Sequence, residues 1–225
     1  EATEYYRNEA NTLAGQVPRT SDGSVSFQTF DQLAAQAGEG FKTLTYEKHY
    51  PIFAGSTLPV KKLGWSDMYV SMGITGFTFA LTGEAAVNPQ APDVSLPFTM
   101  CHELAHRQAV TAEDDANFCA YLACMASEDD DFRYSGAFGA YIYCHNALSK
   151  IDKTAASQIW STLSDGVLAD IRAANAHYEQ YEGKVQDTAQ KVNDTYLKAF
   201  SEESGVQSYG EAADLLIAWY LKNNA

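Results

Sequence analysis

The sequence has few basic residues and no long apolar run. Its 225 residues include 15 Lys and Arg against 29 Asp and Glu, a formal net charge of -14. Nucleic acids and anionic membrane surfaces are bound through basic faces, so this charge argues against both as partners. The most apolar stretch, Leu215–Leu221, is far shorter than the roughly 20 residues of a membrane-spanning helix. The sequence therefore predicts no nucleic-acid partner and no membrane span within these residues.

Cysteine is also scarce. The four cysteines form no CxxC pair, and all lie in the apolar middle of the chain: Cys101, Cys119, Cys124 and Cys144. Apolar surroundings favour buried free thiols over disulfides, because free cysteine packs as a small hydrophobic residue. For Cys119 there is one further option, a thiolate ligand, if it lies beside a bound metal.

Two of the five histidines stand in the motif His-Glu-Leu-Ala-His at 102–106. On a helix, His102 and His106 are four positions apart and share one face, close enough to hold a single metal ion. Glu103 follows the first histidine, where it can act as general base toward a metal-bound water. With so few histidines, chance produces such a motif on the order of once in a hundred sequences. The alternative is a core helix with two hydrogen-bonded histidines.

A catalytic zinc site needs a third protein ligand, and an acidic run beginning at Glu113 supplies candidates. On a helical wheel Asp115 shares an apolar stripe with Phe118 and Leu122, which predicts that it points inward. A buried acid must be paired or bound to metal, so Asp115 is the expected ligand and Glu113 the alternative. A further alternative is that these acids only stabilise the helix N-terminus through its dipole.

The pattern predicts a single mostly helical α+β domain over 1–225. It has an N-terminal helical and irregular part (1–64), a sheet with the metal-binding helices (65–127) and a C-terminal helical part (128–225). Aromatic and β-branched residues predict two or three short strands within 69–88, with a turn at Thr82-Gly83. The acidic run 128–131 is expected to be a solvated loop. Other helices are expected from residue 1 to a turn near 15, over 27–37 with Ser26 as cap, after a cap at Thr111, and over 134–150, 154–181, 184–202 and 209–222 with Ser208 as cap.

Further residues around the motif carry a resemblance. The HELAH segment is followed by Ala116-Asn117-Phe118 and by Ala120–Cys124, and matching flanks lie at 82–85, 96–99, 132–136 and 208–216. From about residue 65 onward the chain resembles a family of bacterial membrane-anchored proteins. That family is catalogued as a domain of unknown function and grouped with the zinc metallopeptidases, on the gluzincin side of the zincins.

The resemblance implies a zincin-like metallopeptidase fold with the small sheet before the HExxH helix. It implies a zinc ion held by His102 and His106, with Glu103 as catalytic base. It also implies an extracytoplasmic domain, anchored by N-terminal membrane helices outside this chain. The family typically has Glu before Ala-Asn-Phe, whereas this chain has Asp115, whose side chain is about 1.5 Å shorter. Either the helix lies closer to the metal or Glu113 takes over.

The functional prediction is hydrolysis of a peptide or protein substrate by a zinc-activated water, with Glu103 as base. Such a mechanism needs an oxyanion donor, for which Tyr134, Tyr209 and His145 are the candidates. The strands near 77–81 could bind the peptide backbone by strand addition, and ordinary sheet packing is the alternative.

Two other functions stay open at this point. One is a zincin-like ectodomain with little or no activity, acting as a sensor or binding module, which the change to Asp115 favours. The other is a helical interaction domain without metal. The intact Glu103 favours the peptidase, because a structural zinc site does not need a base at that position.

Overall fold

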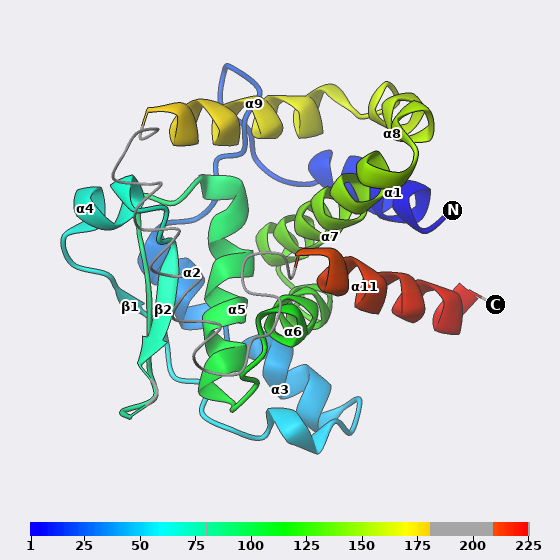
Figure 1. The fold of residues 1–225 in the computed structure, drawn as a ribbon. Helices are drawn as coiled ribbons and strands as arrows, with labels where there is room; N and C mark the ends of the chain where they lie inside the picture. Colours follow the sequence, from blue (N-terminus) through cyan, green and yellow to red (C-terminus); the bar gives the residue numbers. More distant parts are fainter. Residues whose placement is uncertain (80, 181–208, 225) are drawn as a thin grey trace.

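The structure, a computed structural model, describes residues 1–79, 81–180 and 209–224. Helices dominate these residues, and one small sheet lies beside them, which confirms the mostly helical α+β class (Figure 1). The helices are α1 (Ala2–Ala14), α2 (Phe30–Gln36), α3 (Glu39–Tyr46), α4 (Ser66–Ser71), α5 (Leu96–Arg107), α6 (Glu113–Met125), α7 (Asp130–Ile151), α8 (Lys153–Trp160), α9 (Asp165–Glu179) and α11 (Tyr209–Asn224). The strands are β1 (Lys61–Lys62), β2 (Gly76–Phe79) and β3 (Glu84–Val87), and short 3-10 turns lie at Pro51–Phe53 and Asp93–Ser95.

The sheet is mixed and has the order β1-β3-β2. Strand β3 pairs in parallel with β1 and antiparallel with β2, in a register that sets Phe77 opposite Ala86. The expected turn between β2 and β3 is present, and Gly83 takes a left-handed φ of 66° there, a conformation that glycine adopts without steric cost. The sheet therefore precedes α5 in the chain, as expected.

The beginning of the expected strand segment is a helix instead. Residues 66–71 form α4, which follows Trp65 in a left-handed conformation (φ 58°). Ser66 and Asp67 suit the first turn of a helix, whose free N–H groups and dipole favour polar and acidic side chains. The β-propensity of Tyr69 and Val70 did not decide the local structure, because strand preference depends strongly on packing context.

Helix α5 lies between the sheet on one side and α6 and α7 on the other (Figure 1). Its N-terminus is buried, and Ser135 from α7 supplies the hydrogen bonds needed there. The Ser135 hydroxyl accepts from the backbone N–H of Phe98 at 3.1 Å and donates to the carbonyl of Val94 at 2.6 Å. Pro97 in the first turn has no N–H to satisfy. The buried N-terminus of α5 therefore has hydrogen-bond partners for its backbone groups.

One continuous cluster of buried apolar side chains runs from Tyr6 in α1 to Leu216 in α11. Helix α6 packs against α5, α7, α3 and α11, so it contacts other helices on several sides rather than on one face only. Ala116 and Ala120 on α6 are completely buried. Small side chains at such positions let neighbouring helices approach closely. None of the described helices is long and apolar enough to span a membrane.

Two expected helix starts differ from the structure. Helix α2 begins at Phe30 with a Thr29–Gln32 capping box, not at a Ser26 cap, and α6 begins at Glu113 after Ala112, which offers no side-chain cap, rather than after Thr111.

Only the first half of the acidic run is a loop: Glu128 is exposed there, the Asp129 side chain caps α7 by accepting from the N–H of Asp131, and α7 begins at Asp130. The expected 154–181 helix is two helices, and Ser164 caps the second. The helix expected over 184–202 and the Ser208 cap lie outside the described residues.

Candidate metal centre

Helix α5 presents His102 and His106 on one face, as their spacing predicts. The two rings lie with centroids 4.6 Å apart and are nearly perpendicular, at 88°. Their Nε2 atoms are 3.0 Å apart. Both side chains are mostly buried, at 14% and 16% exposure. The two imidazoles therefore direct one nitrogen each at the same point.

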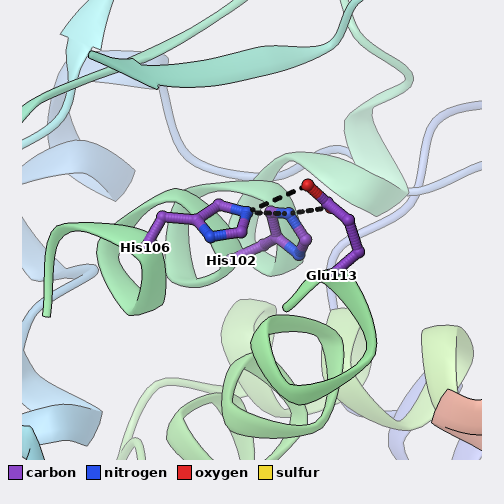
Figure 2. A group of neighbouring side chains, drawn as sticks. All are labelled: His102, His106 and Glu113. Atoms are coloured by element: carbon purple, nitrogen blue, oxygen red, sulfur yellow. Dashed lines mark hydrogen bonds and ion pairs between the residues drawn. The ribbon is translucent and has the colours of Figure 1, made fainter. Parts of the chain in front are cut away.

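Glu113, the first residue of α6, completes the group (Figure 2). Its Oε2 lies 3.2 Å from Nε2 of His102, and its Oε1 lies 3.5 Å from Nε2 of His106. Figure 2 shows the two histidines side by side on one helix and Glu113 reaching toward them from the start of the next. Among the described residues, these three side chains are the group of His, Cys, Asp and Glu whose ligand atoms lie close enough to hold a metal ion.

Asp115 does not point toward the histidines, so the preference for Asp115 over Glu113 as the inward-facing acid is wrong. Asp115 is exposed, while Phe118 and Leu122 on the supposed inward stripe are only half-buried. The helical wheel failed because α6 is covered on several sides, so its larger apolar residues do not mark the face toward α5. The alternative, Glu113, is the acid that the structure brings to the two histidines.

The three side chains perturb one another electrostatically. Burial raises the pKa of Glu113, but hydrogen bonds from His102 and His106 outweigh it and hold that pKa well below its ordinary value. Burial likewise lowers the pKa of His106, but the hydrogen bond and charge of Glu113 outweigh it and raise the pKa to about 8. In the absence of a metal, a proton on the imidazoles therefore offsets the carboxylate charge.

A backbone carbonyl orients the second histidine. Nδ1 of His106 lies 2.7 Å from the carbonyl oxygen of Val110, so Nδ1 is the donor and, in the neutral imidazole, Nε2 presents its lone pair to the cluster. The chain reverses at Ala109, which has a left-handed φ of 69°, and the N–H of Val110 donates to Ala105 at 3.1 Å. This reversal holds the Val110 carbonyl against the ring.

Glu103 is almost completely buried, at 4% exposure, and lies between α5 and β2. The Thr78 hydroxyl lies 2.7 Å from Oε2 of Glu103 and 2.9 Å from its backbone carbonyl. A Cβ on Gly76 would be 2.7 Å from Oε1 of Glu103, so β2 approaches this closely only because residue 76 is glycine. Burial raises the pKa of Glu103, and the nearby His102 and His106 oppose that shift.

The oxyanion candidates do not join this group. Tyr134 is completely buried in α7, and its hydroxyl donates to Asp170. His145 packs between the rings of Tyr141 and Trp160, at centroid distances of 5.4 and 5.2 Å. Both expectations are therefore wrong, because these side chains are engaged elsewhere in the fold. Tyr209 lies outside the residues whose side chains are described.

The four cysteines are free and buried, as expected. Cys119 is not part of the metal-binding group described above. Burial and the charge of Asp115 raise the pKa of its thiol to about 12, which disfavours the thiolate that a metal ligand requires. The optional role of Cys119 as a ligand is therefore unsupported.

Asp114, the second residue of α6, makes a long-range contact that its place in the acidic run does not predict. It is 4% exposed, and its Oδ1 accepts a hydrogen bond from the backbone N–H of Ala212 in α11 at 3.0 Å. The contact joins residues 98 positions apart. Asp114 therefore ties the first turn of α6, which carries Glu113, to the first turns of α11. Only its place next to Glu113 could have suggested this.

The fold and the site together define a mostly helical α+β protein with a His-His-Glu group that could hold a metal ion. The chain belongs to the family described as "Protein of unknown function (DUF3810)", which it matches over residues 1–217. No curated protein and no solved structure matches the chain. The family gives no activity, so function must be inferred from the site.

Proposed function

We propose that this domain is a zinc-dependent peptidase of the zincin type. The observation that carries the proposal is the convergence of His102, His106 and Glu113 beside the buried Glu103. Attachment through membrane helices outside this chain, on the extracytoplasmic face, belongs to the same proposal and rests on the family resemblance alone.

The donor set fits zinc. Zinc bound to nitrogen and oxygen at about 2.0–2.1 Å in a tetrahedron has ligand atoms about 3.3–3.4 Å apart. The two Nε2 atoms lie 3.0 Å apart, Nε2 of His102 lies 3.2 Å from Oε2 of Glu113, and Nε2 of His106 lies 3.5 Å from Oε1 of the same carboxylate, so these distances bracket that value. Two imidazoles and one carboxylate form a ligand set of catalytic zinc sites, in which the fourth position is left for water. The Val110 carbonyl binds Nδ1 of His106 and so orients the ring, as the hydrogen-bond partners of metal-binding histidines do.

Zinc bound here would supply a water of lowered pKa and would polarise a substrate carbonyl. Glu103 would accept the proton of that water and deliver it to the leaving amine. Thr78 holds the Glu103 carboxylate in place. Burial raises the pKa of Glu103, which makes its carboxylate a better proton acceptor.

Metal binding is tested on protein freed of metal by chelation. Titration with zinc should load one ion per chain, and the double variant His102→Ala/His106→Ala should load none. A chain that takes up no zinc would exclude both the peptidase and the metal-dependent sensor, and would leave a helical interaction domain.

Hydrolysis is tested with a peptide library and the variant Glu103→Gln, which keeps the shape of the side chain. Loss of the general base should lower the rate by about 10²–10⁴-fold, while zinc content is unchanged. Glu128→Gln, an exposed acid on the loop before α7, is the matched control. If wild type and Glu103→Gln load zinc but cleave equally poorly, the domain is a metal-containing sensor or binding module instead.

A further inference from the structure

Three aromatic rings lie on the face of the sheet that points away from α5. Successive strand residues point to opposite faces, and Gly76 and Thr78 point toward Glu103, so Phe77 and Phe79 point the other way. They are 40% and 49% exposed. Tyr69 of α4 lies beside Phe77, with ring centroids 6.3 Å apart. We call Tyr69, Phe77 and Phe79 the outer aromatic face. Large rings grouped at the surface mark interaction sites more often than single exposed residues do.

The strand that carries two of these rings has a free edge. Within the described part of the chain, β2 pairs with β3 alone. Hydrogen-bonded and non-bonded pairs alternate along an antiparallel ladder. The N–H of Asn88 donates to the carbonyl of Thr75, so Thr75 and Asn88 form a hydrogen-bonded pair. By alternation, Phe77 and Ala86 form the next hydrogen-bonded pair, and Gly76 and Val87 between them form a non-hydrogen-bonded pair. The backbone groups of Gly76 and Thr78 therefore point to the free edge.

The pairing of β3 with β1 also indicates that Gly76 and Val87 form a non-hydrogen-bonded pair. The carbonyl of Val87, opposite Gly76, accepts from the N–H of Leu63 and so points toward β1 rather than β2. An extended chain added at the free edge of β2 would use the backbone groups of Gly76 and Thr78. Its side chains would then alternate between the α5 side, where Glu103 lies, and the outer aromatic face.

We infer that the substrates are extended peptides with aromatic or large apolar side chains at alternate positions, selected by Phe77 and Phe79. The inference rests on the proposed peptidase function and adds its substrate class. Side chains directly opposite each other on neighbouring strands lie about 4.5–5.5 Å apart. Two peptide side chains at positions i and i+2 would therefore each lie opposite one ring, the first opposite one of Phe77 and Phe79 and the second opposite the other. Residues facing α5 would be less restricted, because Gly76 and Thr78 offer no large apolar side chain to them.

The surroundings favour a peptide over other occupants. Two lysines near the sheet form ion pairs, Lys61 with Glu84 and Lys62 with Asp31, and Arg107 donates to the carbonyls of Gly83 and Leu58, so these cations are engaged within the protein rather than grouped to attract anionic lipid. A stable dimer buries about 800 Å² per partner. The three rings of the outer aromatic face, at about 150–250 Å² each, fall short of that area by themselves, and self-association is one of the outcomes that the experiment below distinguishes. A single strand of a few residues matches the size of the face.

Binding is measured by fluorescence anisotropy with zinc-loaded Glu103→Gln protein, so that peptides are not consumed. The first peptide has Phe at alternate positions, the second has Ser there, and the third has the same Phe residues placed next to each other. We expect the first to bind at least roughly tenfold more tightly than the others. Phe77→Ser/Phe79→Ser should abolish the preference and leave zinc affinity unchanged. Ile151→Ser, which changes an 86%-exposed apolar residue at the end of α7, should change nothing.

An unaltered preference in Phe77→Ser/Phe79→Ser protein would overturn the inference. So would peptides that bind without preference while the two rings prove necessary for binding to phosphatidylcholine vesicles or for self-association in sedimentation. Phe79→Ser alone, which changes the more exposed ring, gives the same comparison if the double variant does not fold. Turnover is assayed separately with Glu103 intact. If the protein binds the first peptide selectively but does not cleave it, the peptidase proposal is wrong and the inferred peptide preference stands. If it cleaves peptides without this preference, the peptidase proposal stands and the inferred substrate class is wrong.

Discussion

Two clusters of polar side chains lie among the buried residues of this protein, and they differ in what they can still bind. In the first, Asp170 of α9 is enclosed by donors. Its Oδ1 accepts from the N–H of Val25 at 2.7 Å, and its Oδ2 accepts from Arg19 at 3.0 Å and from the Tyr134 hydroxyl. Both oxygens are satisfied, and the cation that neutralises Asp170 belongs to the protein. This cluster joins α7, α9 and the loop after α1, and the Asp170 carboxylate takes its hydrogen-bond donors from the chain itself.

The second cluster, His102, His106 and Glu113, brings acceptors together instead. Two imidazole nitrogens and a carboxylate lie within 3.5 Å of each other, without a cationic side chain of fixed charge among them. Only a proton or a metal ion can hold such a group together. The comparison shows that a buried charge alone does not indicate function. A surplus of converging lone pairs does, because it must be completed from outside the chain.

The largest expected effect lies in the closed cluster. Asp170→Ala removes the carboxylate that pairs with Arg19 and accepts from the Tyr134 hydroxyl, and breaking a buried pair costs about 3–5 kcal/mol. Urea denaturation should show this loss, while the zinc affinity of the folded variant stays at the wild-type value. Glu179→Ala, on the exposed end of the same helix, should stay within about 0.5 kcal/mol of wild type. A drop in zinc affinity with Asp170→Ala would mean that the two clusters are coupled.

The next effect distinguishes Glu113 from Asp115, the two acids of α6 that were candidates for the third ligand. Glu113→Gln removes a charged ligand and should lower zinc affinity by more than the roughly 10–100-fold that outer-shell partners cost. Asp115→Asn changes an exposed side chain and should leave zinc affinity unaltered. Competition titration against a chromogenic chelator measures both. The reverse order of effects would return the third ligand to Asp115.

A smaller effect is expected at Asp114, which ties α6 to α11. Asp114→Ala removes the acceptor for the Ala212 N–H and should cost about 1 kcal/mol of unfolding free energy, as the loss of a helix cap does. Zinc affinity should fall as well, because the turn that carries Glu113 loses its anchor. Asp114→Asn keeps an acceptor oxygen and should restore most of both. Failure of Asn to restore either quantity would show that the charge, not the hydrogen bond, matters.

The smallest effect is on pH dependence. The pKa of His106 is raised to about 8, so the protonated pair with Glu113 stabilises the metal-free protein below the ordinary histidine pKa, and this contribution is lost as pH rises through about 8. Zinc requires a neutral imidazole, so its affinity should rise with pH over the same interval. Melting temperatures without zinc and zinc titrations, both between pH ~6 and ~9, should therefore change in opposite directions. Glu113→Gln should shift both changes to lower pH.

Local features of the site were predictable from the sequence. His102 and His106 lie together because four positions make just over one turn of any α-helix, whatever surrounds it. Glu103 is adjacent to the first histidine by covalent connection. The free state of the four cysteines followed in the same way from their apolar surroundings and the absence of paired spacing.

The third ligand and the oxyanion candidates were not predictable in this way. Glu113 and Asp115 are both acids in the first turn of α6, and their sequence pattern favoured the wrong one. Tyr134 is a plausible donor by residue type, but Asp170, 36 positions away, accepts its hydroxyl. In each case the deciding contact joins residues of different helices, and helix periodicity does not specify how two helices pack against each other.

By itself the sequence determined a helix with two histidines on one face, a base beside them and a mostly helical class, because these depend on helix geometry and composition. The tertiary structure alone decided that Glu113 meets the histidines, that Asp114 is tied to α11 and that β2 has a free edge beside an aromatic face. The physical reason is that helix periodicity fixes which side chains share a face. Which face is buried depends on every element packed against it.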